Sequence, residues 1–286
     1  MVSSSVIGFI LRPLHGPVGI LGAGLFLLFV ATALLAPWIS PFDPMAINYL
    51  PAGQLARLMP PGEPYWLGTT YYGRDVLSQI ICGARMSLLV GLTAAVITVS
   101  IGVNIGLVSG YFGGRTDALL MRLTDVAFGI PFLPFTVLLV ALLQPSVWNI
   151  ILTISCLQWR SAARVIRAQT MALRVRAFVR AAEVAGASHM RIMYRHIFPS
   201  LLPITLLYVA FGIAYSVLSE ASISFLGFGD PGQVSWGGML HDAYITGSLS
   251  LAWWPVLPAG ACITFFVLST FMIARQYERG VDPRLG

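Results

Sequence analysis

The apolar positions of this chain gather into long stretches that contain no charged side chain. Five such stretches lie between Arg12 and Asp43, Arg85 and Arg115, Asp125 and Arg160, Arg195 and Glu220, and Asp242 and Arg275. A helix needs about 20 apolar residues to cross a bilayer, and each stretch exceeds that length. The pattern predicts an all-α integral membrane protein, because buried helices of a large soluble protein would show shorter gaps with more charge between them.

We predict six membrane-spanning helices. Pro131 and Pro134 are expected to bend the third span, and Pro145 to separate it from the fourth. The predicted spans are 18–39, 87–108, 119–143, 147–165, 201–225 and 253–273.

The spans divide the chain into four regions. An N-terminal segment with the first span covers 1–40, and a proline-rich segment follows at 41–85. This segment is too irregular to lie unpaired in lipid, so we place it outside the membrane. A core of five spans covers 86–276, and a short tail covers 277–286.

Composition supports the bilayer as the solvent of this protein. Residues of the set AVILMFWYC make up 57% of 286 positions and charged residues only 10%, whereas soluble domains carry about 25% charged residues. The net charge of +6 needs no nucleic-acid partner, because all 17 basic residues are arginines that can act as an orientation signal. With both termini in the cytoplasm, 14 of them fall on the inner side, and only Arg57, Arg74 and Arg85 lie outside.

Glycines on the second span repeat at a four-residue spacing: Gly102, Gly106 and Gly110. Small residues at this spacing let two helix backbones approach closely inside a membrane. We predict a tight helix–helix seam there, the alternative being glycines tolerated by chance in a glycine-rich membrane chain.

The segment 166–199 is the longest arginine-rich loop and carries the most information about function. Its apolar positions Val175, Phe178, Val179, Ala182 and Ala185 follow helical spacing and form one stripe. Gly186 stands where the end of a helix favours a left-handed residue, and Ser188 can cap a following helix. The segment is therefore predicted to form a short amphipathic helix, a sharp turn and a second helix that enters the membrane.

Three interpretations of this helix remain open from the residues alone. An arginine-rich amphipathic helix can lie on an anionic membrane surface, or belong to a solvated loop held inside by its charge. A protruding helix with a small-residue tip also suits docking into a cleft of another protein.

The same segment resembles the EAA loop of ATP-binding-cassette importer permeases. Ala181, Ala182, Gly186 and Pro199 stand at the positions of that pattern, while Arg180 replaces its glutamate and His196 stands where isoleucine is common. The resemblance implies that the chain is coupled to an ATPase through Phe178, Ala181, Ala182, Glu183, Gly186, His196 and Pro199.

Further segments resemble the C-type permease subunit of dipeptide, oligopeptide and nickel importers. They are LGTTYYGRDVLSQIICGARMSLLVG at 67–91, YFGGRTDALLMRLTDVAFGIPFL, RHIFP, SFLGFG and DPRLG. The first departs from the family pattern at Thr70, in place of an acidic residue, and at Gln79, in place of arginine. Taken in order, these segments span nearly the whole chain.

This resemblance implies the type I importer fold and a place in a bacterial inner membrane. It also implies three kinds of partner: a second homologous permease, two ATPase subunits and an external solute-binding protein. The expected cargo is a di- or oligopeptide, and the cargo cannot be named more closely from this chain.

Residues of a transport pathway are weakly encoded. Ser216, Glu220 and Ser222 near the outer end of the fifth span are candidates to line it, because an ionisable residue at membrane depth suggests function. Glu220 can equally be a structural residue at the interface. The resemblance implies a structured external turn at Gly68, Gly73, Arg74 and Asp75 that gates the pathway or receives the binding protein.

Trp236, Trp253 and Trp254 are expected to be interfacial anchors. His241 beside Asp242 is only a weak indication of a metal, and no metal or cofactor is predicted. Cys82, Cys156 and Cys262 are widely spaced and suit packed free thiols.

Two other function classes fit the sequence less well. An ion-coupled carrier or channel would favour acids in the middle of spans and inverted repeats, and no repeat is evident. A membrane enzyme would need paired carboxylates or a nucleophile with its base. The chain has no lysine and no phosphate-binding loop, so any ATP hydrolysis is expected in partner subunits.

Overall fold

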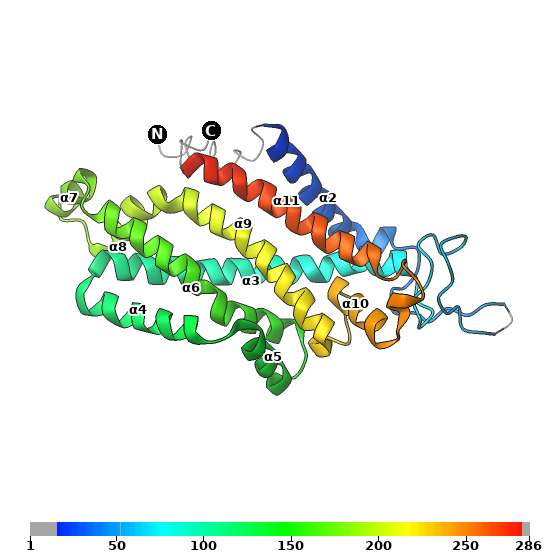
Figure 1. Ribbon diagram of the computed structural model, residues 1–286. Helices are drawn as coiled ribbons and strands as arrows, with labels where there is room; N and C mark the ends of the chain where they lie inside the picture. The colour runs from blue at the N-terminus through cyan, green and yellow to red at the C-terminus, as the bar shows by residue number, and fades with distance from the viewer. Residues whose placement is uncertain (1–15, 52, 282–286) are drawn as a thin grey trace.

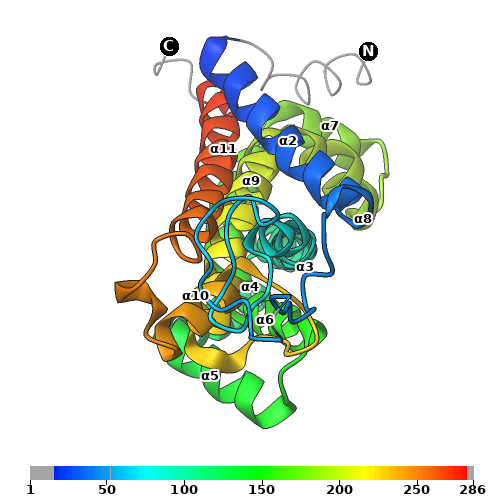
Figure 2. The ribbon, with the colours of Figure 1, turned by 90° about the vertical axis from the view of Figure 1, so that its right-hand side faces the viewer.

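A long central helix organises the computed structural model, which describes residues 16–51 and 53–281. This helix, α3 (Val76–Phe112), runs through the bundle and packs against α6 (Val147–Arg174), α9 (Phe198–Ile223) and α2 (Pro17–Ile39). Helix α11 (Leu257–Val281) packs against α9 and α2. Figures 1 and 2 show α2 and α11 together on one side of α3, with α6 on another.

The two ends of the bundle differ. At one end lie α7 (Ala177–Val184), α8 (His189–Arg191) and the π-helical segment η2 (Ile192–Ile197) that leads into α9 (Figure 1). At the other end lie the segment between α2 and α3, the π-helical segment η3 (Ser224–Phe228), α10 (Trp236–Ile245) and the short η4 (Ser248–Ser250). The two bridges of the α2–α3 segment join Tyr49 to Leu55 and Thr69 to Asp75.

The predicted third span is two helices rather than one bent helix. Helix α4 (Gly114–Gly129) ends at Ile130, and α5 (Phe132–Leu143) leaves it at an angle of 87°. Pro131 precedes α5 and has no N–H to donate, which explains why the helix stops there. The expected bend at Pro131 is confirmed, but it is a break.

Four helical runs of the described residues are long and apolar enough to cross a membrane, and the broken pair α4–α5 would make a fifth. The four are Pro17–Ile39, Val76–Phe112, His189–Phe228 and Leu257–Glu278. Helix α6 does not pass that test, and its residues 160–174 carry four arginines: Arg160, Arg164, Arg167 and Arg174. The finding thus supports an all-helical membrane protein with four or five candidate spans, one or two fewer than the six predicted.

Several predicted boundaries shift. Residues 76–85, expected in the external segment, are the first turns of α3, and residues 166–174, expected in the loop, continue α6. Trp253 and Trp254 precede α11 instead of opening it. Residues 277–281 of the expected tail continue α11, while Arg12, Arg284 and the rest of 282–286 lie outside the described residues.

The predicted glycine seam holds α3 against α6. A Cβ added at Gly102 would lie 2.7 Å from the Trp159 carbonyl oxygen, and one at Gly106 would lie 2.7 Å from the Ala163 carbonyl oxygen. At Gly110 it would meet the Arg167 carbonyl oxygen at the same distance. Three successive turns of α3 therefore touch the backbone of α6, with no room for a methyl group.

We expect Gly106→Ala to destabilise the subunit by about 1–3 kcal/mol, because overpacking against a backbone atom forces the two helices apart. The matched control is Gly24→Ala on α2, where an added Cβ has no neighbour within 4 Å. That change should be neutral or stabilising, since alanine favours a helix over glycine by about 1 kcal/mol. Thermal unfolding of the purified protein, followed by size-exclusion chromatography, measures both; equal stability of the two variants would contradict the seam.

Candidate functional site

The segment between α6 and α9 forms the predicted helix, turn and helix. Gly186 has a φ of 76°, in the left-handed region. The Ala187 N–H donates to the Ala182 carbonyl and the Gly186 N–H to the Glu183 carbonyl, both at 3.0 Å, which is the hydrogen-bond pattern of a glycine-terminated helix. The Ser188 hydroxyl then accepts from the Arg191 N–H at 3.4 Å and caps α8.

The apolar stripe of α7 is divided between two faces. Val179 is fully buried and Ala182 is 9% exposed, both packed in a cluster with α3 and η2, whereas Phe178 is 42% exposed. Val184, which was not part of the predicted stripe, is 90% exposed. The stripe is therefore not a single docking surface: one side fixes α7 to its own chain, and the other carries exposed apolar side chains.

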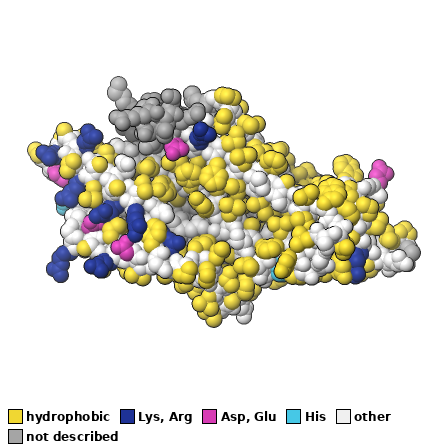
Figure 3. Space-filling model, in the orientation of Figure 1, with side chains coloured by type: hydrophobic (Ala, Val, Ile, Leu, Met, Phe, Trp, Pro, Cys, Tyr) yellow, Lys and Arg dark blue, Asp and Glu magenta, His cyan; other side chains and the backbone are white. Residues whose placement is uncertain are grey.

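The remaining residues of the predicted coupling set lie around this helix. Ala181, Glu183 and Gly186 are exposed, and His196 and Pro199 are half-buried in η2 and at the start of α9. Figure 3 shows the basic side chains gathered at this end of the molecule, while hydrophobic side chains cover much of its middle. The turn thus projects from the most basic end of the bundle.

Two hydrogen bonds that the sequence did not suggest tie this segment to α3. The Tyr111 hydroxyl lies 2.9 Å from Nδ1 of His189, and the Tyr194 hydroxyl donates to the Asn104 side-chain oxygen. Tyr111 also lies under the guanidinium of Arg174, at the end of α6. Because these partners are 78 and 90 residues apart, no local spacing could have revealed them.

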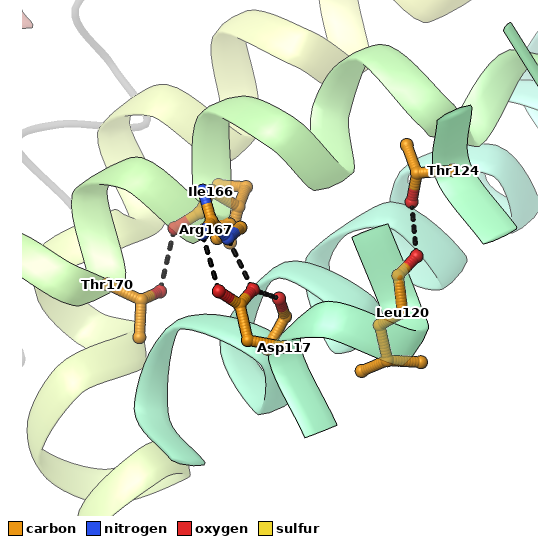
Figure 4. A network of polar contacts seen from close by, with 7 residues as sticks. Asp117, Leu120, Thr124, Ile166, Arg167 and Thr170 are labelled. Carbon is orange, nitrogen blue, oxygen red and sulfur yellow. Dashed lines mark hydrogen bonds and ion pairs between the residues drawn. The ribbon is translucent and has the colours of Figure 1, made fainter. Parts of the chain in front are cut away.

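Ion pairs join α4 to the middle of α6. The Arg167 guanidinium makes two hydrogen bonds of 2.5 Å to the Asp117 carboxylate, which also accepts a hydrogen bond from Ser109 of α3 (Figure 4). Nearer the middle of α6, Arg164 donates to Asp125 at 2.6 Å. Asp117 thus links three helices at one point.

The candidate pathway residues are mostly interior. Ser216 and Glu220 are fully buried, and Ser222 donates a hydrogen bond to the Leu218 carbonyl of its own helix. Ser224 donates to Oε1 of Glu220 at 2.7 Å, while Oε2 has no hydrogen-bond partner among the described residues. Because Glu220 presents no surface to solvent here, this conformation offers it no contact with cargo.

The external turn is a compact structure at the start of α3. Gly68 and Gly73 have φ values of 72° and 74°, and the Gly73 N–H donates to the Thr70 carbonyl at 3.0 Å. Asp75 caps α3 by accepting from the Ser78 N–H at 2.8 Å. A Cβ at Gly68 would lie 2.4 Å from the Met59 carbonyl oxygen, so the glycine is required by close approach as well as by conformation.

Arg74 points from this turn to α10. Its guanidinium lies 3.7 Å from the Asp242 carboxylate. Burial raises the pKa of Asp242, and the positive charges of Arg74 and His241 oppose that rise. Nδ1–H of His241 donates to the Phe225 carbonyl at 2.8 Å, and the described residues hold no group of three or more His, Cys, Asp or Glu that could bind a metal ion.

The prediction that Trp236 is an interfacial anchor is wrong. Its side chain is 1% exposed, and its indole N–H donates to the Ile80 carbonyl at 3.0 Å. Trp254 is half-buried and donates to the Thr69 carbonyl at 3.1 Å, whereas Trp253 is 55% exposed. Two of the three tryptophans therefore fasten the external segment and α10 to the bundle.

The structure is a bundle of apolar helices with an exposed helical turn at its basic end. Residues 102–283 match the family of binding-protein-dependent transport system inner membrane components, and this chain belongs to that family. It is the inner-membrane permease subunit of an ATP-binding-cassette importer, whose ATP is hydrolysed by a partner. Family membership also implies a solute-binding protein as a partner.

Relatives with similar length are named as peptide permeases. The chain is 35% identical over 269 residues to a putative peptide transport system permease protein of Brucella suis, covering 93% of this chain and 87% of the relative. It is 36% identical over 269 residues to a dipeptide transport system permease protein of Haemophilus influenzae, covering 91% and 89%. It is 32% identical over 280 residues to an oligopeptide transport system permease protein of Bacillus subtilis, covering 96% and 88%.

The fold also matches a solved transporter. A chain of the MetNI methionine transporter in an inward-facing conformation superposes with a TM-score of 0.57 at 15% identity, covering 71% of this chain and 96% of that chain. At that identity the likeness supports the importer permease fold and nothing about cargo.

We expect Asp117→Asn to destabilise the subunit by about 1–3 kcal/mol, because it leaves a partly buried guanidinium without its carboxylate. Asp125→Asn is the matched control: that pair is about half exposed, so its loss should cost under about 1 kcal/mol. Thermal unfolding of the two variants measures the difference. The double substitution Asp117→Arg with Arg167→Asp should recover part of the loss, and a loss equal to that of the control would refute the role of this pair.

Proposed function

We propose that this chain is one of two homologous permease subunits of an importer for di- or oligopeptides. The two permeases would enclose the pathway, with two ATPase subunits on the cytoplasmic side and a peptide-binding protein outside. The names of the relatives, which match over about nine-tenths of this chain, support the cargo class. Reconstitution with the neighbouring subunits should give ATP-dependent peptide uptake, and the absence of uptake for every di- and oligopeptide supplied with the binding protein would refute the cargo class.

The observation that carries the coupling proposal is the two-faced helix α7. Val179 and Ala182 lock it to α3 and η2, and Phe178 and Val184 remain exposed on a turn that projects from the bundle. A helix held rigidly on one side and apolar on the other suits a groove in an ATPase. An amphipathic helix that simply lay on lipid would not need a buried side.

The same contacts suggest how the motion would be transmitted. When ATP closes the ATPase pair, α7 would move together with η2 and the cytoplasmic end of α3, because Tyr111 and Asn104 bond to His189 and Tyr194. Helix α6 would follow through the glycine seam. The bundle would then change between two packings, a two-state equilibrium biased by nucleotide.

We further propose six spans with both termini in the cytoplasm. The span added to the five candidates would be α6, the fourth along the chain. The start of α6 is mostly apolar, and Arg164 and Arg167 pair with carboxylates of α4 instead of facing lipid. The concentration of basic side chains at the α7 end favours that end as cytoplasmic (Figure 3).

Phe178→Ala combined with Val184→Ser should weaken ATPase docking while leaving the fold intact, because both side chains are exposed in this chain. We expect loss of co-purifying ATPase in detergent with a normal amount of inserted permease. The matched control is Leu249→Ser, an exposed apolar residue at the opposite end. Equal co-purification of both variants would remove the coupling assignment, as would crosslinks from position 184 that reach only phospholipid.

Gly186→Val should uncouple transport from ATP hydrolysis. The left-handed φ of 76° costs a β-branched residue about 1–3 kcal/mol, so the turn should change shape, although nothing lies within 4 Å of the added Cβ. Peptide uptake and binding-protein-stimulated ATPase activity would be measured on the same proteoliposomes. Normal values of both would contradict the role of the turn.

A further inference from the structure

A cavity of about 450 Å³ lies between α3, α5, α6 and α9, beside the break that separates α4 from α5. Its volume falls within the range of about 300–1,000 Å³ that is usual for small-molecule sites. Phe132, Phe211 and Tyr215 give it apolar walls, and the rest of the lining includes several hydroxyl and amide groups. Its lining contains no aspartate or glutamate, and Arg160 is its one charged residue.

Arg160 stands at the middle of α6. It is the fourteenth of 28 residues, so it lies about 20 Å from either end of the helix at 1.5 Å per residue. An ionised side chain that lines a cavity of a membrane bundle is costly and is a candidate functional residue.

The charge of Arg160 differs from those of the next two arginines on α6. Arg164 and Arg167 each have a carboxylate partner, Asp125 and Asp117. Arg160 has instead the carbonyl oxygens of Ala127 and Ile130, at the end of α4, and none of the ion pairs of the described residues includes it.

Carbonyl groups accept hydrogen bonds but do not neutralise a full positive charge. Both of these bonds come from Nη1, and the guanidinium has further N–H donors on Nε and Nη2. A planar fork of this kind matches a carboxylate well.

Groups that suit the amides of a peptide lie in the same cavity. The Gln158 amide donates to the Ser219 hydroxyl at 2.9 Å and accepts from Ser216 at 3.4 Å. An amide side chain has both a donor and an acceptor, so Gln158 can pair with the N–H and C=O groups of a peptide.

We propose that this cavity binds a peptide in transit, and that the Arg160 guanidinium receives its terminal carboxylate. Gln158 then faces the amide groups of the peptide. The proposal rests on the proposed peptide import and adds the site within the pathway and the end of the peptide that it recognises. An acidic side chain of the second permease facing Arg160 is the competing occupant.

The first test measures protection of a cysteine at Ser161, which is exposed and lines the cavity. In the complete transporter in nanodiscs, with Cys82, Cys156 and Cys262 replaced by alanine, Ser161→Cys is modified by a small thiol reagent. Dialanine with a free carboxylate is then added. At a concentration of twice the Kd of dialanine the modification should be about 3-fold slower, because the fraction of empty cavities falls by that factor. Dialanine amide should not protect, and Ser200→Cys, exposed and outside the lining, should be unaffected by either.

The second test changes the arginine. Arg160→Gln should abolish protection by free dialanine, while Arg160→Lys, which keeps the charge, should retain part of it. Equal protection by the acid and the amide, protection that survives Arg160→Gln, or no protection would overturn the proposal. The comparison of acid with amide keeps Arg160 in place, so it remains decisive if the glutamine variant does not fold.

Measurements of peptide uptake distinguish a failure of this proposal from a failure of the proposed function on which it rests. The ratio of the uptake rate of free peptide to that of amidated peptide is measured for the unaltered and the Arg160→Gln transporter. Both measurements use the same binding protein, so the preference of the binding protein affects both ratios equally. A fall in that ratio is expected. If uptake is normal but the ratio is unchanged, the competing occupant or a purely structural arginine is correct; if no peptide is taken up, the proposed cargo fails as well.

Discussion

The close approach of α3 and α6 is the constraint on which the rest of the molecule depends. Inside a membrane no hydrophobic effect draws two helices together, so packing and polar contacts must do it. Gly102, Gly106 and Gly110 let α6 lie directly on α3 along three turns. That position places the arginines of α6 opposite α4, and it places the end of α6 where α7 can follow. If α3 and α6 lay further apart, the ion pairs between α4 and α6 would no longer be linked to the coupling segment that packs on α3.

The partners of the arginines on α6 change along the helix. Arg167 is bound by a partly buried carboxylate and Arg164 by a more exposed one, whereas Arg160 contacts backbone carbonyls and the ring of Phe128. The break between α4 and α5 makes this possible, because the last carbonyls of a helix lack the N–H partners four residues on that a continuous helix would supply. The interior carboxylate of Glu220, in contrast, lies near the opposite end among hydroxyl groups.

The sequence predicted the features that depend on local spacing. The glycine repeat, the left-handed turn at Gly186 and the cap at Ser188 all follow from one or two helical turns, and all three appear in the structure. It did not predict which side of α7 is buried, because that depends on packing against α3, which is distant in sequence, and on how η2 folds back after the turn. The prediction for Trp236 is wrong for the same reason. An aromatic residue near the end of a span suits a membrane interface, and only the contact with Ile80 shows that Trp236 is interior. The span predicted at 147–165 stays a prediction: α6 is not among the helices apolar enough to cross a membrane, and a hydropathy average takes no account of the partners of its arginines.

The length of α3 has a mechanical consequence. Its 37 residues correspond to about 56 Å, whereas the hydrocarbon core of a bilayer is about 30 Å thick. Even with tilt, several turns of α3 extend past the lipid tails. If that excess lies at the α7 end, the turns that carry Gly110 and Tyr111 hold α6 and α8 beyond the lipid tails. The turn at Gly186 then stands clear of the headgroups, where a large soluble protein can reach it without displacing lipid.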